Sequence, residues 1–129
     1  MKKLVLLIAL LLAIAACSSG VSPPTTGTIP VEGYVHAGPI CPVAQDPPDP
    51  NCGDRPVAGA HLRVLDSSGT EAAVVTTSTD GVFVVLLSPG SYTLEPQPVE
   101  GLLGTASSQG FQVGPAAPAL DVAYDTGIR

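Results

Sequence analysis

The side chains that could carry chemistry in this chain are few: three cysteines, two histidines and eleven acidic residues. Nucleophilic catalysis needs a nucleophile, a histidine and an acid within mutual reach. The sequence has no G-x-S-x-G nucleophile elbow, and alternation places His61 on the outward face of a predicted strand. Asp121 and Asp125 could be a catalytic pair of carboxylates, but the polar face of another predicted strand accounts for them without catalysis. These observations predict that the chain is not an enzyme.

The candidate metal ligands lack the spacing that metal sites need. The two histidines and two of the cysteines contain no C-x-x-C or H-x-x-x-H pair, the close spacing typical of zinc sites. Three aspartates of one loop have carbonyl neighbours that could help them bind calcium weakly, but they do not follow the order of EF-hand ligands. Solvated loop residues explain these aspartates more simply, so we expect no metal and no cofactor. The residues concerned are His36, Cys41, Cys52 and His61 for zinc, and Asp46, Asp49 and Asp54 for calcium.

The N-terminal residues carry the pattern of an export signal. A cationic start, Met1–Lys3, precedes an apolar run of 13 residues, Leu4–Ala16. This run is shorter than the ~20 residues that span a bilayer, so it fits a signal peptide. Small residues before Cys17 resemble the bacterial lipobox. That resemblance implies a signal peptide at 1–16, lipidation of Cys17 and a membrane anchor, with an ordinary secretory signal or an uncleaved anchor as alternatives.

The residues after Cys17 predict a spacer and then one domain. Residues 17–28 are rich in Ser, Thr, Gly and Pro and bury too little apolar area to fold, so we expect a flexible tether. Removal of 1–16 leaves three basic and eleven acidic residues, a formal charge of −8, and no lysine. A chain this acidic has no basic patch for nucleic acid. Without lysine it also has no Schiff-base nucleophile.

Residues 37–59 form a long loop that contains the two remaining cysteines. An exported protein meets oxidising conditions, which favours a Cys41–Cys52 disulfide. Closing this loop of about 12 residues would stabilise the fold by about 2.8 kcal/mol. Four prolines stiffen the enclosed segment. A loop ordered in advance favours recognition of a partner, although protection of the loop from proteolysis is an equal alternative.

The rest of the chain predicts an all-β fold. Fourteen glycines and fourteen prolines disfavour helices. Ser68-Gly69 and Asp80-Gly81 are hairpin-turn dipeptides, and Pro89-Gly90 suits a type II turn. Short alternating segments between such turns predict a seven-stranded antiparallel β-sandwich over 29–129. The expected strands are 29–36, 60–65, 72–77, 82–87, 91–95, 110–113 and 119–124.

A series of short motifs supports this fold by resemblance. They are Gly33-x-Val35, Pro56-Val57-Ala58-Gly59-Ala60, Thr79-Asp80-Gly81-x-Phe83 and Leu87-x-Pro89-Gly90-x-Tyr92-x-Leu94. Residues 29–95 thereby resemble the carboxypeptidase regulatory-like domain, a transthyretin-like or prealbumin-like sandwich that is also similar to Cna-B modules. The resemblance implies a non-catalytic accessory, adhesive or scaffold role. The Lys–Asn crosslink of some Cna-B modules does not carry over, because lysine is absent after the signal.

Together these features predict a lipid-anchored module on the extracytoplasmic face of a bacterial cell envelope. Its expected role is structural or accessory, with a possible envelope protein partner at loop 37–59. The alternative is a module that binds carbohydrate, another small ligand or calcium. Candidate binding residues are Asp46, Asp49, Asp54 and Tyr34. Of the aromatic residues, Tyr34 is the best placed for stacking, because strand alternation puts it on the face opposite Val35. A hydrolase with a shallow site is the third hypothesis.

Overall fold

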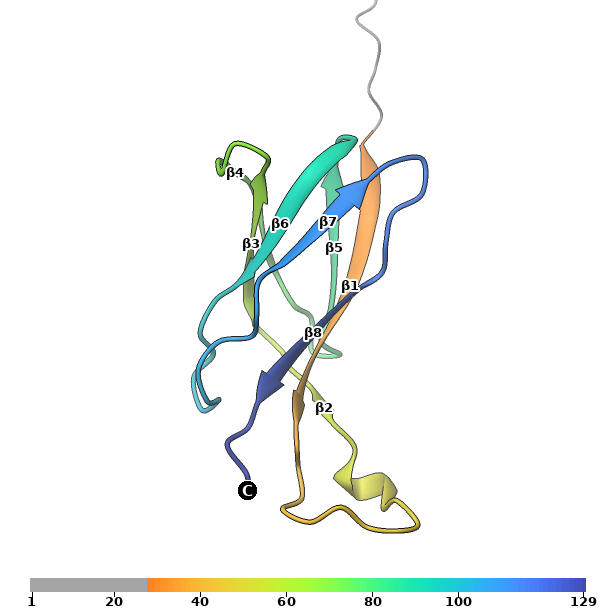
Figure 1. Cartoon of the computed structure of the whole chain (residues 1–129), viewed down its shortest axis with the longest axis vertical. Coiled ribbons are helices and arrows are strands. Elements are labelled where there is room, and N and C mark those ends of the chain that lie inside the picture. Colours follow the sequence, from red (N-terminus) through yellow and green to blue (C-terminus); the bar gives the residue numbers. More distant parts are fainter. Residues whose placement is uncertain (1–27) are drawn as a thin grey trace, which may run out of the picture.

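A computed structural model describes residues 28–129 and shows two β-sheets packed face to face, which confirms the all-β sandwich (Figure 1). The predicted signal peptide, Cys17 and nearly all of the predicted tether lie outside the described residues. Within 28–129, no helix is both long and apolar enough to cross a bilayer. The strands are β1 Ile29–Gly38, β2 Arg55–Pro56, β3 His61–Asp66, β4 Glu71–Thr76, β5 Val82–Leu87, β6 Gly90–Pro96, β7 Gln109–Val113 and β8 Leu120–Asp125, with a short 3-10 helix η1 at Pro50–Cys52.

The first sheet is organised around β1. Along one edge of β1, the antiparallel strand β5 pairs with its first half and β2 pairs with its far end. Strand β8 runs parallel to β1 along the other edge, with Gly33 opposite Leu120 and Gly38 opposite Asp125. We expected antiparallel strands throughout, and this pair differs because the connection after β7, residues 114–119, carries the chain from the second sheet to the first, where β8 runs in the same direction as β1. The second sheet has the order β4-β3-β6-β7 and is antiparallel.

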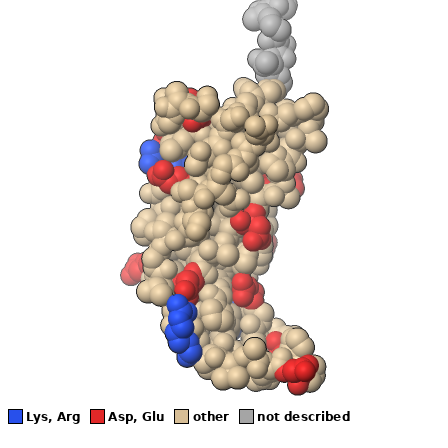
Figure 2. Space-filling model, viewed as in Figure 1, with Lys and Arg blue, Asp and Glu red and all other residues tan. Residues whose placement is uncertain are grey.

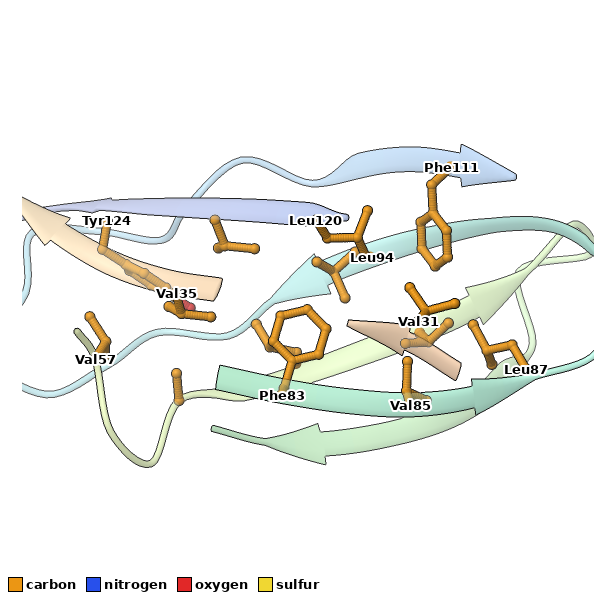
Figure 3. Packing of buried hydrophobic residues seen from close by; sticks show 14 of the residues in the cluster. Val31, Val35, Val57, Phe83, Val85, Leu87, Leu94, Phe111, Leu120 and Tyr124 are labelled. Carbon is orange, nitrogen blue, oxygen red and sulfur yellow. The ribbon is translucent and has the colours of Figure 1, made fainter. Parts of the chain in front are cut away.

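The core follows the alternation of the sequence. Phe83, Val85 and Leu87 of β5 point inward, while the intervening residues are exposed. Figure 3 shows these side chains meeting Val31, Leu94 and Phe111 from other strands. Burial of such side chains stabilises a fold by about 1.5–3 kcal/mol each.

One glycine lets the largest core side chain approach β1. A Cβ built on Gly33 would collide with the ring of Phe83, which lies across the backbone at that position. Phe83 is only 2% exposed. The Gly33-x-Val35 motif therefore has a steric reason, since any larger residue would displace this ring.

The turns keep their predicted residues but differ in what they connect. Ser68-Gly69 closes a hairpin between the paired strands β3 and β4, with Gly69 at φ 81°. Asp80-Gly81 was expected to close a hairpin too, but it joins β4 to β5, which belong to different sheets. The chain therefore crosses the sandwich at this point. Here Gly81 has a φ of 74°, and its carbonyl oxygen accepts a hydrogen bond from the N–H of Val35 at 2.7 Å.

Two buried or half-buried hydroxyls fasten the connections. Thr77, 6% exposed, donates to the carbonyl of Val57 at 2.6 Å and accepts from the N–H of Ala60 at 2.9 Å. Tyr92 turns inward as predicted, and its hydroxyl donates to the carbonyl of Ser88 at 2.7 Å. These bonds satisfy polar groups that would otherwise weaken the sandwich corners.

Candidate functional site

The predicted disulfide is present and closes a protruding loop between β1 and β2. The Cα atoms of Cys41 and Cys52 lie 5.3 Å apart. The second cysteine ends η1, whose first turn is capped by Asp49: its Oδ1 accepts from the N–H of Asn51 at 2.8 Å. Figure 1 shows the loop as the end of the molecule farthest from the start of β1.

The loop encloses a wide, mostly apolar hollow of about 450 Å³. Prolines, small aliphatic residues and the disulfide supply most of its wall, and the side chain of Val43 at its rim is 69% exposed. Figure 2 shows acidic groups at the tip of this loop and spread singly over the visible face. A second hollow of about 310 Å³ lies at the same end, between Ile40, Val57 and Leu102.

A histidine bridge holds the base of the loop, and sequence reasoning did not find it. His36, on the outer face of β1, bonds through Nδ1 to Asp54 Oδ2 at 2.7 Å and through Nε2 to Asp121 Oδ2 at 3.0 Å. Its side chain is 16% exposed, whereas the carboxylates are 46% and 70% exposed. Because Asp54 lies two residues after Cys52 in the loop and Asp121 belongs to β8, the imidazole ties the loop to the sheet.

The bridge also changes the proton affinity of the imidazole. The hydrogen bond with Asp121, and then that with Asp54, raises the pKa of His36 above its ordinary 6.5, while burial opposes the shift. A doubly protonated ring can donate to both carboxylates at once, which a neutral ring cannot. Both ring nitrogens are engaged, so the arrangement forms a structural clasp and leaves no free nitrogen to act as a general base.

The C-terminal residues close the other side of the loop base. The N–H of Thr126 donates to the carbonyl of Gly38 at 3.1 Å, and its hydroxyl donates to the carbonyl of Pro39. Arg129 donates to both carboxylate oxygens of Asp125, which lowers the pKa of that carboxyl group. The Asp125–Arg129 ending thus helps to fix where the loop leaves β1.

The structure distributes the predicted binding residues over two places. Tyr34, 38% exposed and opposite the buried Val35 as expected, stacks on His36 with ring centroids 5.4 Å apart. Asp54 joins the same cluster through its bond to His36, while Asp46 and Asp49 lie in the loop. Across residues 28–129, no three metal-ligating side chains are gathered at one point. Cys17 lies outside the described residues.

The signal for the bridge was present but depended on an unpredicted pairing. Alternation placed Asp121 on the polar face of its strand, but no outward position was predicted for His36. Only the parallel β1–β8 register, with Tyr34 opposite Asp121, brings the carboxylate to the imidazole.

Fold and site together define a β-sandwich with a stapled loop at one end, and the comparisons with known proteins agree with that class. A family described as "Protein of unknown function (DUF1416)" matches residues 50–113, from η1 through β7. No curated protein matches the chain.

Similar solved structures include two bacterial pilins. A minor pilin of Streptococcus agalactiae has a TM-score of 0.58 at 12% identity, covering 77% of this chain and 44% of that one. The shaft pilin of Lactobacillus rhamnosus GG has a TM-score of 0.53 at 14% identity, covering 76% and 48%. The TIE protein of Bacillus anthracis has a TM-score of 0.52 at 16% identity, covering 75% and 17%. This chain spans less than half of each neighbour, and such identities establish a shared fold alone.

Proposed function

We propose that this chain is a non-enzymatic, lipid-anchored module of the bacterial cell envelope whose stapled loop recognises a partner protein. The fold shared with pilins, together with a disulfide, supports a structural role outside the cytoplasm. The motifs of residues 29–95 add the resemblance to carboxypeptidase regulatory-like domains. The lipobox resemblance supports anchoring through Cys17.

The position of the loop supports its role in recognition. Strand β1 is 10 residues long, which corresponds to about 33 Å, and it separates the point where the chain enters the sandwich from the loop (Figure 1). An anchor attached before β1 would therefore leave the loop uncovered. This geometry suits a segment that meets another molecule.

The single observation that carries the proposal is an exposed apolar hollow whose walls are fixed in advance. The disulfide, η1 and the His36 clasp restrain the loop before any partner binds, which reduces the entropy lost on association. Val43 presents an apolar side chain at the rim of that hollow. Apolar groups surrounded by polar ones are typical of the centre of a protein interface.

The test places a photo-crosslinking residue at Gln45, in the loop of the full chain, and crosslinks it in the envelope of living cells. Two variants with an added charge are compared. Val43→Glu puts a charge on the rim, and Val74→Glu puts the same charge on β4, where the side chain is 54% exposed. We expect defined crosslinked products in the wild type and in Val74→Glu, and their loss in Val43→Glu. Absence of products, or equal products in both variants, would refute recognition through the loop.

Anchoring and thiol state are tested separately by intact mass of the purified chain. We expect a mass that begins at a lipidated Cys17 and lacks two hydrogens at the remaining cysteines. A Cys17→Ser variant should lose the lipid and leave the membrane fraction. A chain that retains residues 1–16 without lipid would contradict the anchor.

A further inference from the structure

Strand β5 ends the first sheet and differs from the other edge strands. Its six residues, VFVVLL, contain no charged or polar side chain. The other edges described in 28–129 contain Arg55 and Pro56 in β2, Glu71 in β4, Gln109 and Gln112 in β7, and Asp121 in β8. Proteins normally place charge, proline or a bulge on an exposed edge to prevent pairing with another chain. Strand β5 has none of these side chains.

The outer face of β5 is also apolar and open. Val82, Val84 and Leu86 are 43%, 50% and 62% exposed, although they are large hydrophobic side chains. They form one strip along the strand, because alternate residues of a strand share a face. An apolar strip beside a free edge is a surface that another molecule can cover.

The hydrogen-bond pattern shows which backbone groups of β5 face the free edge. The N–H of Val35 donates to Gly81, and β5 pairs with β1 in the same register, so Phe83, Val85 and Leu87 direct their peptide groups toward β1. The peptide groups of the alternate residues point the other way. The carbonyl of Val82 already accepts from the N–H of Ser78 at 2.9 Å. Val84 and Leu86 therefore present free donors and acceptors.

We propose that β5 pairs antiparallel with β5 of a second copy of this chain, joining the two first sheets across a two-fold axis. Placing Val84 opposite Leu86 of the second copy, and the reverse, satisfies both free residues with about four backbone hydrogen bonds. The same register puts Val85 of each copy at the axis and merges the two apolar strips. An isologous contact of this kind closes as a dimer.

Charge favours a second copy as the occupant of this edge. The chain carries a formal charge of −6, so most ways of bringing two copies together oppose like charges. The nearest acidic residue on this face is Glu32 on β1, opposite Val84. In the proposed pair the two Glu32 residues are three strand spacings apart, about 14 Å, which exceeds the Debye length of about 8 Å at physiological salt. Pairing through β5 therefore avoids the repulsion.

The test measures the association state of the full chain by sedimentation in a mild neutral detergent, over a dilution series. We expect the wild type to change from one chain to two as concentration rises. Leu86→Lys should remain a single chain, because it places a charge in the merged strip. Leu103→Lys is the matched control: Leu103 is 57% exposed and lies between β6 and β7, so this variant should still pair.

A charge swap tests the register. Val84→Lys alone should abolish pairing, and Val84→Lys combined with Leu86→Glu should restore it, since each lysine then faces a glutamate of the other copy. Thermal melting of every variant checks folding. If Leu86→Lys is unfolded, the milder pair Val84→Thr and Leu86→Thr replaces it and should also prevent pairing.

Three results would overturn the proposal. One is a wild-type chain that stays single up to a concentration on the order of 1 mM, where even a weak specific contact associates. Another is an equal effect of the lysine variants at Leu86 and Leu103. The third is a Cys17→Ser chain that stays single and floats with neutral phosphatidylcholine vesicles, when the same chain with Leu86→Lys does not float; that result would assign this face to lipid.

Discussion

The bridge from His36 to two carboxylates should make the stability of the domain depend on pH in a window set by this one side chain. In the folded protein the pKa of His36 is raised above 6.5, chiefly by its hydrogen bond with Asp121 and then by that with Asp54. The stabilisation is therefore complete below about pH 6.5, the unfolded value, and is lost as the pH rises through the higher folded pKa. Raising the pH should therefore lower the free energy of unfolding. The carboxyl group of an ordinary ion pair has the opposite effect, because its lowered pKa makes stability rise with pH.

The size of the effect follows from exposure. The imidazole is largely buried, but both carboxylates reach solvent, so each pair contributes about 0.2–1 kcal/mol. Two such pairs amount to about 1 kcal/mol, which corresponds to about 4–8 °C in the melting temperature of a domain of this size. The stack of Tyr34 on the ring favours the protonated form in the same direction.

The assay is thermal unfolding followed by circular dichroism from about pH 5.5 to about pH 8.5, a range above the ordinary titration of carboxyl groups. The melting temperature of the wild type should fall across this range. His36→Gln should lose most of that fall. His61→Gln is the matched control: the His61 side chain contacts Thr76 at 3.0 Å, away from the bridge, so this variant should keep the wild-type slope. Proton NMR of the His36 ring gives its pKa directly.

Equal slopes in the wild type and in His36→Gln would refute this reasoning. So would an NMR titration of His36 at or below about pH 6.5, since the sign of the dependence rests on a raised value.

Three further changes test the fold and the loop by equilibrium unfolding. Gly33→Ala should destabilise the domain by about 1–3 kcal/mol because its methyl group meets the ring of Phe83, whereas Gly114→Ala, where no atom lies within 4 Å, should change little. Thr77→Val should lose about 1–3 kcal/mol, since it leaves the two backbone groups bonded to the hydroxyl without that partner. Serine at both cysteines of the loop should lower the free energy of unfolding by about 2.8 kcal/mol. If the free energy of unfolding is unchanged in Gly33→Ala, in Thr77→Val or in the double serine variant, the contact which that variant removes or disturbs is contradicted.

The parts of the fold that local chemistry controls could be predicted from the sequence. Strand β5 was predicted with its observed bounds, because its apolar run is limited by turn residues on both sides. The inward positions of Phe83 and Tyr92 followed from alternation, which needs no knowledge of the neighbouring strand. The disulfide followed from the number of cysteines in a chain that its N-terminal pattern predicts to be exported.

The parts that depend on distant pairing could not be predicted. No residue of Leu120–Asp125 indicates that this strand lies parallel to β1, because the packing of the whole sandwich decides which strand it pairs with. The contact of Asp121 with His36 depends on that choice and was missed with it. Strand β2 has only two residues, too few for any alternation to show.

The two proposed surfaces are compatible because they lie at different positions along β1. The loop lies beyond the far end of β1, and β5 lies along its edge. An antiparallel β5 pair sets the two loops at opposite ends of the dimer, and each remains uncovered. Loss of pairing in Leu86→Lys should therefore leave the loop crosslinks intact, and failure of one proposal leaves the other standing.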